Sequence, residues 1–148
     1  MVDPFFEVKE GNLGQLLLRT ARLFDERAYA RASVVAPQLR RSHLDLFPHI
    51  DLQGTRVTVL AKRMGVSKQA AAVTVADLER LGVVSKHPDP ADGRAKVVRL
   101  TKSGHDYVSK GLFVLRSVSQ DLLEQMDASE RDGLLVGLAA LQRALDGG

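Results

Sequence analysis

The chain has 148 residues, a formal net charge of +3 and no cysteine. The missing thiols exclude disulfides, thiolate metal sites and cysteine-based redox sensing. Because the sequence has no run of about 18 apolar residues, no secretory signal pattern, no internal repeat and no low-complexity tail, we expect one globular domain over residues 1–148, located in the cytoplasm and without membrane contact.

The N-terminal residues predict a short arm followed by a helix. Phe5 and Phe6 lie in the arm, where they can dock on a partner subunit. Gly11-Asn-Leu-Gly14 superficially resembles a glycine-rich loop, but it lacks a preceding strand and a Lys-Ser/Thr tail, so we interpret it as a helix entry. A helix is expected over about residues 12–31, with one stripe of apolar or small side chains. The stripe consists of Leu13, Leu17, Thr20, Phe24 and Ala28.

Residues 58–81 predict two helices joined by a tight turn. The first helix covers residues 58–64, and Gly65 can leave it through a left-handed conformation at little steric cost. Ser67 is expected to cap the N-terminus of the second helix. Helical spacing places four residues of that helix on a buried stripe. They are Ala71, Thr74, Val75 and Leu78.

The opposite face of this second helix is small, and it is polar at the end that meets base edges when a recognition helix docks. Lys68 suits guanine or phosphate, and Gln69 suits adenine. Ala72 and Val73 cannot hydrogen-bond a base, but they can contact a thymine methyl group. The face therefore combines two polar side chains that can hydrogen-bond DNA with two apolar side chains that can contact a thymine methyl group.

A β-hairpin is predicted directly after the two helices. Short β-favouring runs at residues 83–86 and 96–100 flank a segment rich in turn formers, residues 87–94. Arg94 near the tip can enter a minor groove, where the negative potential is strong over A·T-rich segments. Asp92 can pair with Arg94 and fix its direction. The alternative is a surface turn with an exposed ion pair worth about 0–1 kcal/mol.

Charge is concentrated in the same region. Residues 54–104 contain ten Lys or Arg and four acids, a net of +6, whereas residues 1–53 are neutral and residues 105–148 carry four bases and seven acids, a net of −3. A localised positive field attracts a polyanion such as nucleic acid. A solvated charged face is the alternative interpretation.

Two further helices are predicted in the C-terminal third. Thr101 is expected to cap a long helix that runs to Met126, and Asp127 with Glu130 forms a capping box for the last helix. The apolar stripe of the long helix contains Val114, Leu115, Val118, Leu122 and Met126. That of the last helix contains Leu134, Leu138, Leu141 and Leu145. One small core cannot easily cover all these faces, so we expect a two-fold dimer; the alternative is packing on the monomer's own core.

The middle of the chain resembles the MarR family of bacterial transcriptional regulators. The similarity covers about residues 54–104 and is strongest in the hairpin, where the family's Asp-x-Arg and Leu-Thr-x-x-Gly patterns match. The matching residues are Asp92, Arg94, Leu100, Thr101 and Gly104. The family often has hydroxyl or long basic side chains where this chain has Ala72 and Val73.

The resemblance implies a mainly α fold with a small β-hairpin wing. A winged helix-turn-helix at about residues 40–100 is expected between an N-terminal dimerisation helix at about 12–31 and C-terminal dimerisation helices at about 101–146. The expected partners are double-stranded DNA with a pseudo-palindromic operator, a second copy of the chain and a small aromatic or anionic effector, in the manner of a ligand-responsive repressor. The DNA-binding candidates are Ser67, Lys68, Gln69, Ala72, Val73, Arg94 and Lys96, with Asp92 orienting the wing. The dimerisation candidates are Leu13, Leu17, Leu134, Leu138, Leu141 and Leu145.

Two other classes of function are alternatives to this hypothesis. A winged-helix module can use its basic face for protein or RNA contacts without reading DNA. An enzyme is disfavoured because no nucleophile, base and orienting residue converge in the sequence. The four histidines show no close ligand pairing, and Ser42-His43-Leu44-Asp45 is a local cluster rather than a triad. No cofactor or metal is expected.

Overall fold

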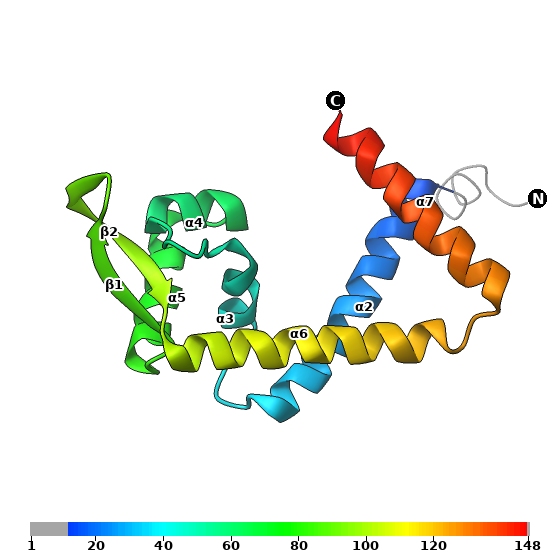
Figure 1. The fold of residues 1–148 in the computed structure, drawn as a ribbon, viewed down its shortest axis with the longest axis horizontal. Coiled ribbons are helices and arrows are strands. Elements are labelled where there is room, and N and C mark those ends of the chain that lie inside the picture. Colours follow the sequence, from blue (N-terminus) through cyan, green and yellow to red (C-terminus); the bar gives the residue numbers. More distant parts are fainter. Residues whose placement is uncertain (1–11, 148) are drawn as a thin grey trace, which may run out of the picture. The chain divides into compact units, whose positions relative to one another are not determined.

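The computed structural model describes residues 12–147, whose contacts group into two compact units, within Met1–Val114 and Leu115–Gly148. The first unit contains helices α2 (Leu13–Val35), α3 (Arg41–Leu46), α4 (Val57–Met64) and α5 (Lys68–Arg80), the 3-10 turn η1 (Phe47–His49), and strands β1 (Val84–Asp89) and β2 (Asp92–Leu100) (Figure 1). Helix α6 (Lys102–Leu123) passes from the first unit into the second, which also contains α7 (Ala128–Asp146). The predicted mainly α fold with a β-hairpin is confirmed, and the single domain over residues 1–148 stays a prediction.

Helix α2 begins as the sequence predicts and ends later. The side chain of Asn12 accepts a hydrogen bond from the Gly14 amide at 2.8 Å, which satisfies one of the amides that a helix start leaves unpaired. The helix continues to Val35 instead of ending near residue 31. Along its predicted stripe Ala28 is buried, whereas Leu13 is 60% exposed. The predicted arm with Phe5 and Phe6 lies outside the described residues.

The core of the first unit forms where α3, α4, α5 and the base of the hairpin meet. Helix α5 buries all four residues of its predicted stripe. Leu46 of α3 and Leu60 of α4 are fully buried in the same cluster as Val83 and Val98 from the hairpin region. Burial of these side chains against one another removes apolar surface from water and holds α5 by its inner face.

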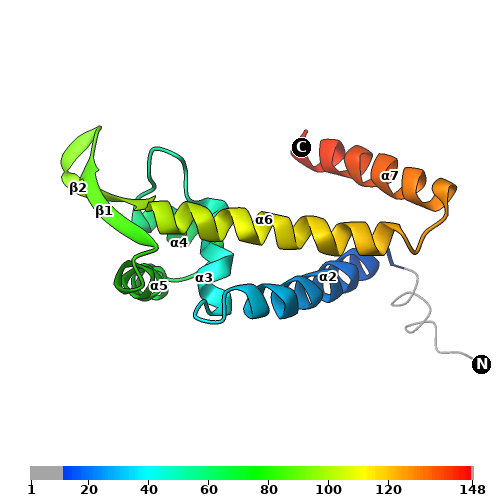
Figure 2. The same cartoon turned by 60° about the horizontal axis from the view of Figure 1, so that its bottom comes forward.

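The hairpin is longer than predicted. Strands β1 and β2 pair antiparallel from Val84 opposite Leu100 to Pro88 opposite Lys96, so the tight turn is confined to Pro90 and Ala91. Composition indicated a long turn at residues 87–94, but a two-stranded ribbon has only edge strands, and an edge strand tolerates proline. Figure 2 shows this hairpin at the same end of the first unit as α5.

Helix α6 starts as expected and stops early. Thr101 Oγ1 accepts from the Gly104 amide at 3.1 Å and lies 2.6 Å from the Gly82 carbonyl oxygen, to which it donates. The helix ends at Leu123 instead of Met126, because the amides of Gln125 and Met126 bond three residues back, to Leu122 and Leu123, in a tightened last turn.

The second unit consists of the end of α6 and helix α7. Asp127 and Glu130 form the predicted capping box, with Glu130 N donating to Asp127 Oδ1 at 2.9 Å and Asp127 N donating to Glu130 Oε2 at 3.0 Å. The leucine stripe of α7 is only partly covered, since Leu138 is 47% and Leu145 is 72% exposed.

Candidate nucleic-acid interface

The turn between α4 and α5 is built by local sequence. Gly65 has a φ of +67°, in the left-handed region that favours glycine, and it ends α4. Ser67 then caps α5, its Oγ accepting from the Ala70 amide at 3.1 Å. Ser67 therefore has a structural role at the start of the helix, whether or not it also contacts DNA.

The outer face of α5 is open. The predicted readers at its first turn, Lys68 and Gln69, are exposed, and so are Ala72, Val73 and Ala76 further along. Val73 is 62% exposed, so it contributes little to the core of its own chain. The helix thus presents two polar side chains followed by a small apolar surface, which is a shape and chemistry that fits the major groove.

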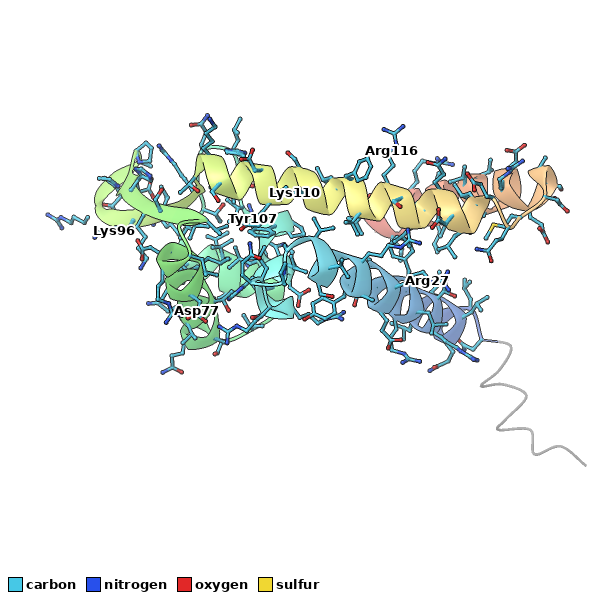
Figure 3. The ribbon with its side chains drawn as sticks, turned by 90° about the horizontal axis from the view of Figure 1, so that it is seen from below. Arg27, Asp77, Lys96, Tyr107, Lys110 and Arg116 are labelled. Carbon is cyan, nitrogen blue, oxygen red and sulfur yellow. The ribbon has the colours of Figure 1, made fainter. Side chains whose placement is uncertain are left out.

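Arg94 lies in an irregular part of the wing. Pro88 pairs with Lys96 and Asp89 pairs with Asp92, so residues 93–95 of β2 have no opposite partners in β1. Such bulges re-aim side chains away from the regular ladder. Arg94 and Lys96 are both exposed, and Figure 3 shows Lys96 on the wing at the same end of the unit as Asp77 of α5.

Asp92 holds Arg94 by its backbone. Oδ1 of Asp92 accepts from the amide of Arg94 at 3.1 Å, while Oδ2 of Asp92 lies 3.9 Å from a guanidinium nitrogen of Arg56. The expected pairing of the Asp92 carboxylate with the Arg94 guanidinium is thus replaced by a hydrogen bond to the main chain. Asp92 sets the backbone of the bulge and leaves the Arg94 charge available.

Some cations of the helix-turn-helix and the wing are paired with acids, and others are not. Arg56, Arg63, Arg80 and Lys86 make ion pairs with acidic side chains of the same unit. In the part of the chain that the structure describes, no acidic side chain lies within ion-pair distance of Lys68, Arg94 or Lys96. Unneutralised charge is therefore present at the start of α5 and on the wing, where it can attract a polyanion such as nucleic acid.

Two clusters of interacting charged side chains near this surface could not be predicted from the sequence. Asp77 of α5 contacts Arg40 and Arg80, and its carboxylate lies 3.8 Å from Nε2 of the buried His43. Burial, followed by the nearby charges of Arg40 and Arg80, lowers the pKa of His43. In sequence these residues are separated by more than a helix, so only the packing of α3 against α5 brings them together.

A second cluster ties the segment before α4 to its surroundings. Arg63 donates to Asp51 Oδ2 at 2.9 Å, and Thr55 Oγ1 donates to the same oxygen at 3.2 Å. The hydrogen bond from Arg63 holds the pKa of Asp51 below its usual range. Arg56 reaches across to Asp89 in β1. This connection between the start of α4 and the wing could not be found from local patterns, because it joins residues 33 positions apart.

Residues 12–147 contain neither a membrane-spanning helix nor a metal-binding group. No helix there is both long and apolar enough to cross a membrane. In the same residues no three His, Asp or Glu side chains are grouped so that they could hold a metal ion.

The helix-turn-helix with an open outer face, followed directly by a hairpin with unpaired cations, defines a winged helix-turn-helix protein. Residues 38–95 match the model of the MarR family. This match confirms, over that segment, the resemblance to the MarR family that the sequence indicated.

Solved structures share this fold over most of their length. RV1404 from Mycobacterium tuberculosis is 26% identical, with a TM-score of 0.74 over 89% of this chain and 90% of that chain. Wild-type MarR from E. coli, in its apo form, is 20% identical, with a TM-score of 0.74 over 87% and 96%. CouR from Rhodococcus jostii RHA1, solved bound to p-coumaroyl-CoA, is 20% identical, with a TM-score of 0.68 over 89% and 92%.

Proposed function

We propose that the chain is a cytoplasmic, homodimeric, ligand-responsive repressor that binds a pseudo-palindromic DNA operator. One observation carries the DNA-binding part of this proposal. Lys68, Arg94 and Lys96 are exposed at one end of the first unit and make no ion pair with the described residues, whereas Arg56, Arg63, Arg80 and Lys86 are paired with acidic side chains. Unpaired cations on a surface that fits the grooves of DNA favour DNA binding, because binding releases the counterions condensed on the phosphates.

In the proposed complex, α5 enters the major groove and the wing follows the adjacent minor groove. Gln69 is the adenine reader, and Lys68 binds guanine or a phosphate. Ala72 and Val73 contact thymine methyl groups. Arg94 enters the minor groove, with Lys96 on the nearby backbone, and favours narrow A·T-rich flanks through groove width. Ser67 contributes as the cap that places Lys68 and Gln69 in the first turn.

A dimer is supported by apolar surface that each unit leaves uncovered. In α2, Leu13 is 60% exposed and Leu17 is half-buried. In α7, the four leucines at helical spacing remain partly or largely exposed. Within the second unit Leu122, Met126 and Leu134 also line an open hollow of about 510 Å³. A second copy offers the same surfaces and would cover them by two-fold symmetry.

A dimer also explains the expected operator. Two recognition helices related by a two-fold axis meet half-sites about 10 base pairs apart, so the operator should be an imperfect palindrome. An effector that prefers the non-binding spacing of the two helices would release the DNA. The p-coumaroyl-CoA complex of CouR supports a small-molecule effector, and an aromatic acid or its thioester is the class to screen first.

The rival function is a basic winged-helix module that contacts protein or RNA without reading DNA. Selection of duplexes from a random pool separates the two. A repressor of the proposed kind should enrich one imperfect palindrome, whereas recovery of no common sequence would favour the rival. Binding of the enriched duplex should then be repeated with a panel of aromatic acids. If no compound changes operator affinity or the melting temperature, the effector part of the proposal is wrong.

A further inference from the structure

The residue just before the helix-turn-helix reaches the tip of the wing. Arg56 directly precedes α4, and its Nε donates to Asp89 Oδ2, while a second guanidinium nitrogen lies 3.9 Å from Asp92 Oδ2. Asp89 is the last residue of β1 and Asp92 is the first of β2. One guanidinium therefore faces both carboxylates that flank the turn. We call Arg56, Asp89 and Asp92 the wing clamp.

The two carboxylates hold the backbone at the tip. Asp89 Oδ1 accepts from the Ala91 amide at 2.8 Å, and Asp92 Oδ1 accepts from the Arg94 amide at 3.1 Å. The Asp89 side chain is only 10% exposed, although the turn beside it is open to solvent. The amide of Ala91, followed by Arg56, lowers the pKa of Asp89, so this carboxylate stays charged and keeps its donors.

The base of the wing is attached to the same segment of chain. Thr55 and Val98 exchange two backbone hydrogen bonds of 3.0 and 2.9 Å, and Arg99 Nε donates to the Gln53 carbonyl oxygen at 2.8 Å. Gly54 has a φ of +99°, and a Cβ there would lie 2.9 Å from Val97 Cγ2. The base is thus fixed by backbone contacts, whereas at the tip the clamp supplies the contacts to the segment before α4.

We propose that Arg56 is a positioning residue that, through Asp89 and Asp92, holds the Arg94 bulge at a set place relative to α4 and α5. Arg56 belongs to the paired group of cations, and its charge is balanced within the protein. Arg56 fixes the position of the wing relative to the recognition helix α5, so that minor-groove and major-groove contacts can form on the same operator. This role of Arg56 rests on the proposed DNA binding, and it adds a residue that sets the spacing between the wing and the recognition helix.

The other role open to Arg56 is a phosphate contact made by releasing Asp89. The two roles predict opposite results for Asp89→Asn. This change removes a negative charge and preserves the shape of the side chain. If Arg56 bound phosphate, its release from the acid would strengthen binding to every duplex. If Arg56 positions Arg94, the same change should erase the preference for A·T-rich flanks without strengthening operator binding.

The first measurement needs no DNA. Amide hydrogen exchange at Ala91 and Arg94 should become faster in Arg56→Gln and Asp89→Asn, and stay as in the wild type in Lys62→Gln. Lys62 is the matched control, because it is an exposed cation of α4 and the change removes the same charge. The charge-reversed pair Arg56→Asp with Asp89→Arg should restore part of the protection. Unchanged exchange in both single variants would overturn the clamp.

The second measurement compares operators that differ only in A·T-rich or G·C-rich flanks, over a salt series. In Arg56→Gln, the ratio of affinities for operators with A·T-rich and G·C-rich flanks should fall to within about twofold of one. The dependence of affinity on salt concentration should stay unchanged. A slope reduced by about 0.9 per wing, with the flank preference retained, would show a phosphate contact and overturn the proposal. If the wild type binds no duplex, the proposed function fails, and the exchange data still decide whether Arg56 holds Arg94.

Discussion

The imidazole of His43 lies 3.8 Å from the carboxylate of Asp77, which joins α3 to the last turns of α5. Nδ1 of His43 accepts from the Arg40 amide at 3.1 Å, so this nitrogen carries no proton. Protonation would place a hydrogen there and break the bond at the start of α3. Arg40 and Arg80, both paired with Asp77, add positive charge nearby. The junction is therefore built for a neutral imidazole.

Stability should consequently fall on mild acidification. The pKa of His43 is lower in the folded chain than the ordinary value of 6.5, so below about pH 6.5 the unfolded chain binds the extra proton first. The free energy of unfolding should decrease between pH 7.5 and pH 5, with a slope of up to about 1.4 kcal/mol per pH unit from this group. Denaturant titrations at several pH values measure the slope. An equal slope in His43→Gln would assign the effect to other groups.

Gly104 should be required where α6 starts. A Cβ at this position would lie 2.1 Å from the Val83 carbonyl oxygen, which already accepts from the Thr101 amide at 3.0 Å. Gly104→Ala must push α6 away from β1, and we expect it to cost about 1–3 kcal/mol of stability. Gly111→Ala is the control in the same helix, since a Cβ there meets nothing within 4 Å, and it should stabilise by about 0.5–1 kcal/mol. Equal effects of the two changes in chemical denaturation would refute this reasoning.

Leu141→Asp should dissociate the proposed dimer. Leu141 lies in the centre of the α7 stripe, and a carboxylate buried there without a partner costs several kcal/mol. Val136, which is 67% exposed, lies on the opposite face of the helix, so Val136→Asp is the matched control. Sedimentation velocity at micromolar concentration should show a dimer for the wild type and the control, and a monomer for Leu141→Asp. A monomeric wild type would end the dimer hypothesis.

Val73 should read thymine by its methyl group. Replacing the contacted thymine with uracil removes only that methyl, and the loss should be about 0.8 kcal/mol, or roughly fourfold in affinity, per half-site. The Val73→Ala variant should no longer distinguish the two bases. Gln69→Ala provides the contrast, because it should weaken operator binding by about 1–3 kcal/mol and still prefer thymine over uracil. Competition binding with each substituted duplex measures the preference.

Arg94→Ala should weaken binding to all duplexes. The change removes an exposed, unpaired cation from the wing, so fewer counterions are released and the salt slope should fall by about 0.9 for each wing in contact. Any loss of sequence preference should be confined to A·T-rich flanks. Fluorescence anisotropy over a salt series tests both points, and unchanged affinity would mean that the wing does not touch DNA.

Local chemistry explains which elements could be predicted from the sequence. Ser67 and Asp127 cap helices through residues three positions away, and Gly65 ends α4 through its own backbone freedom. The buried stripe of α5 follows from helical periodicity alone, as one face of a helix must meet the core. These features depend on neighbours within about one turn, so the order of residues determines them.

Only the tertiary structure decided what the wing and the cations do. The length of the hairpin, the bulge at Arg94 and the link from Arg56 to Asp89 depend on how β1, β2 and α4 pack. Composition predicted a loop where strand pairing continues, and charge counts could not separate the paired Arg56 from the unpaired Arg94. Pairing between distant charges depends on the distance between side chains in space, which no local pattern encodes.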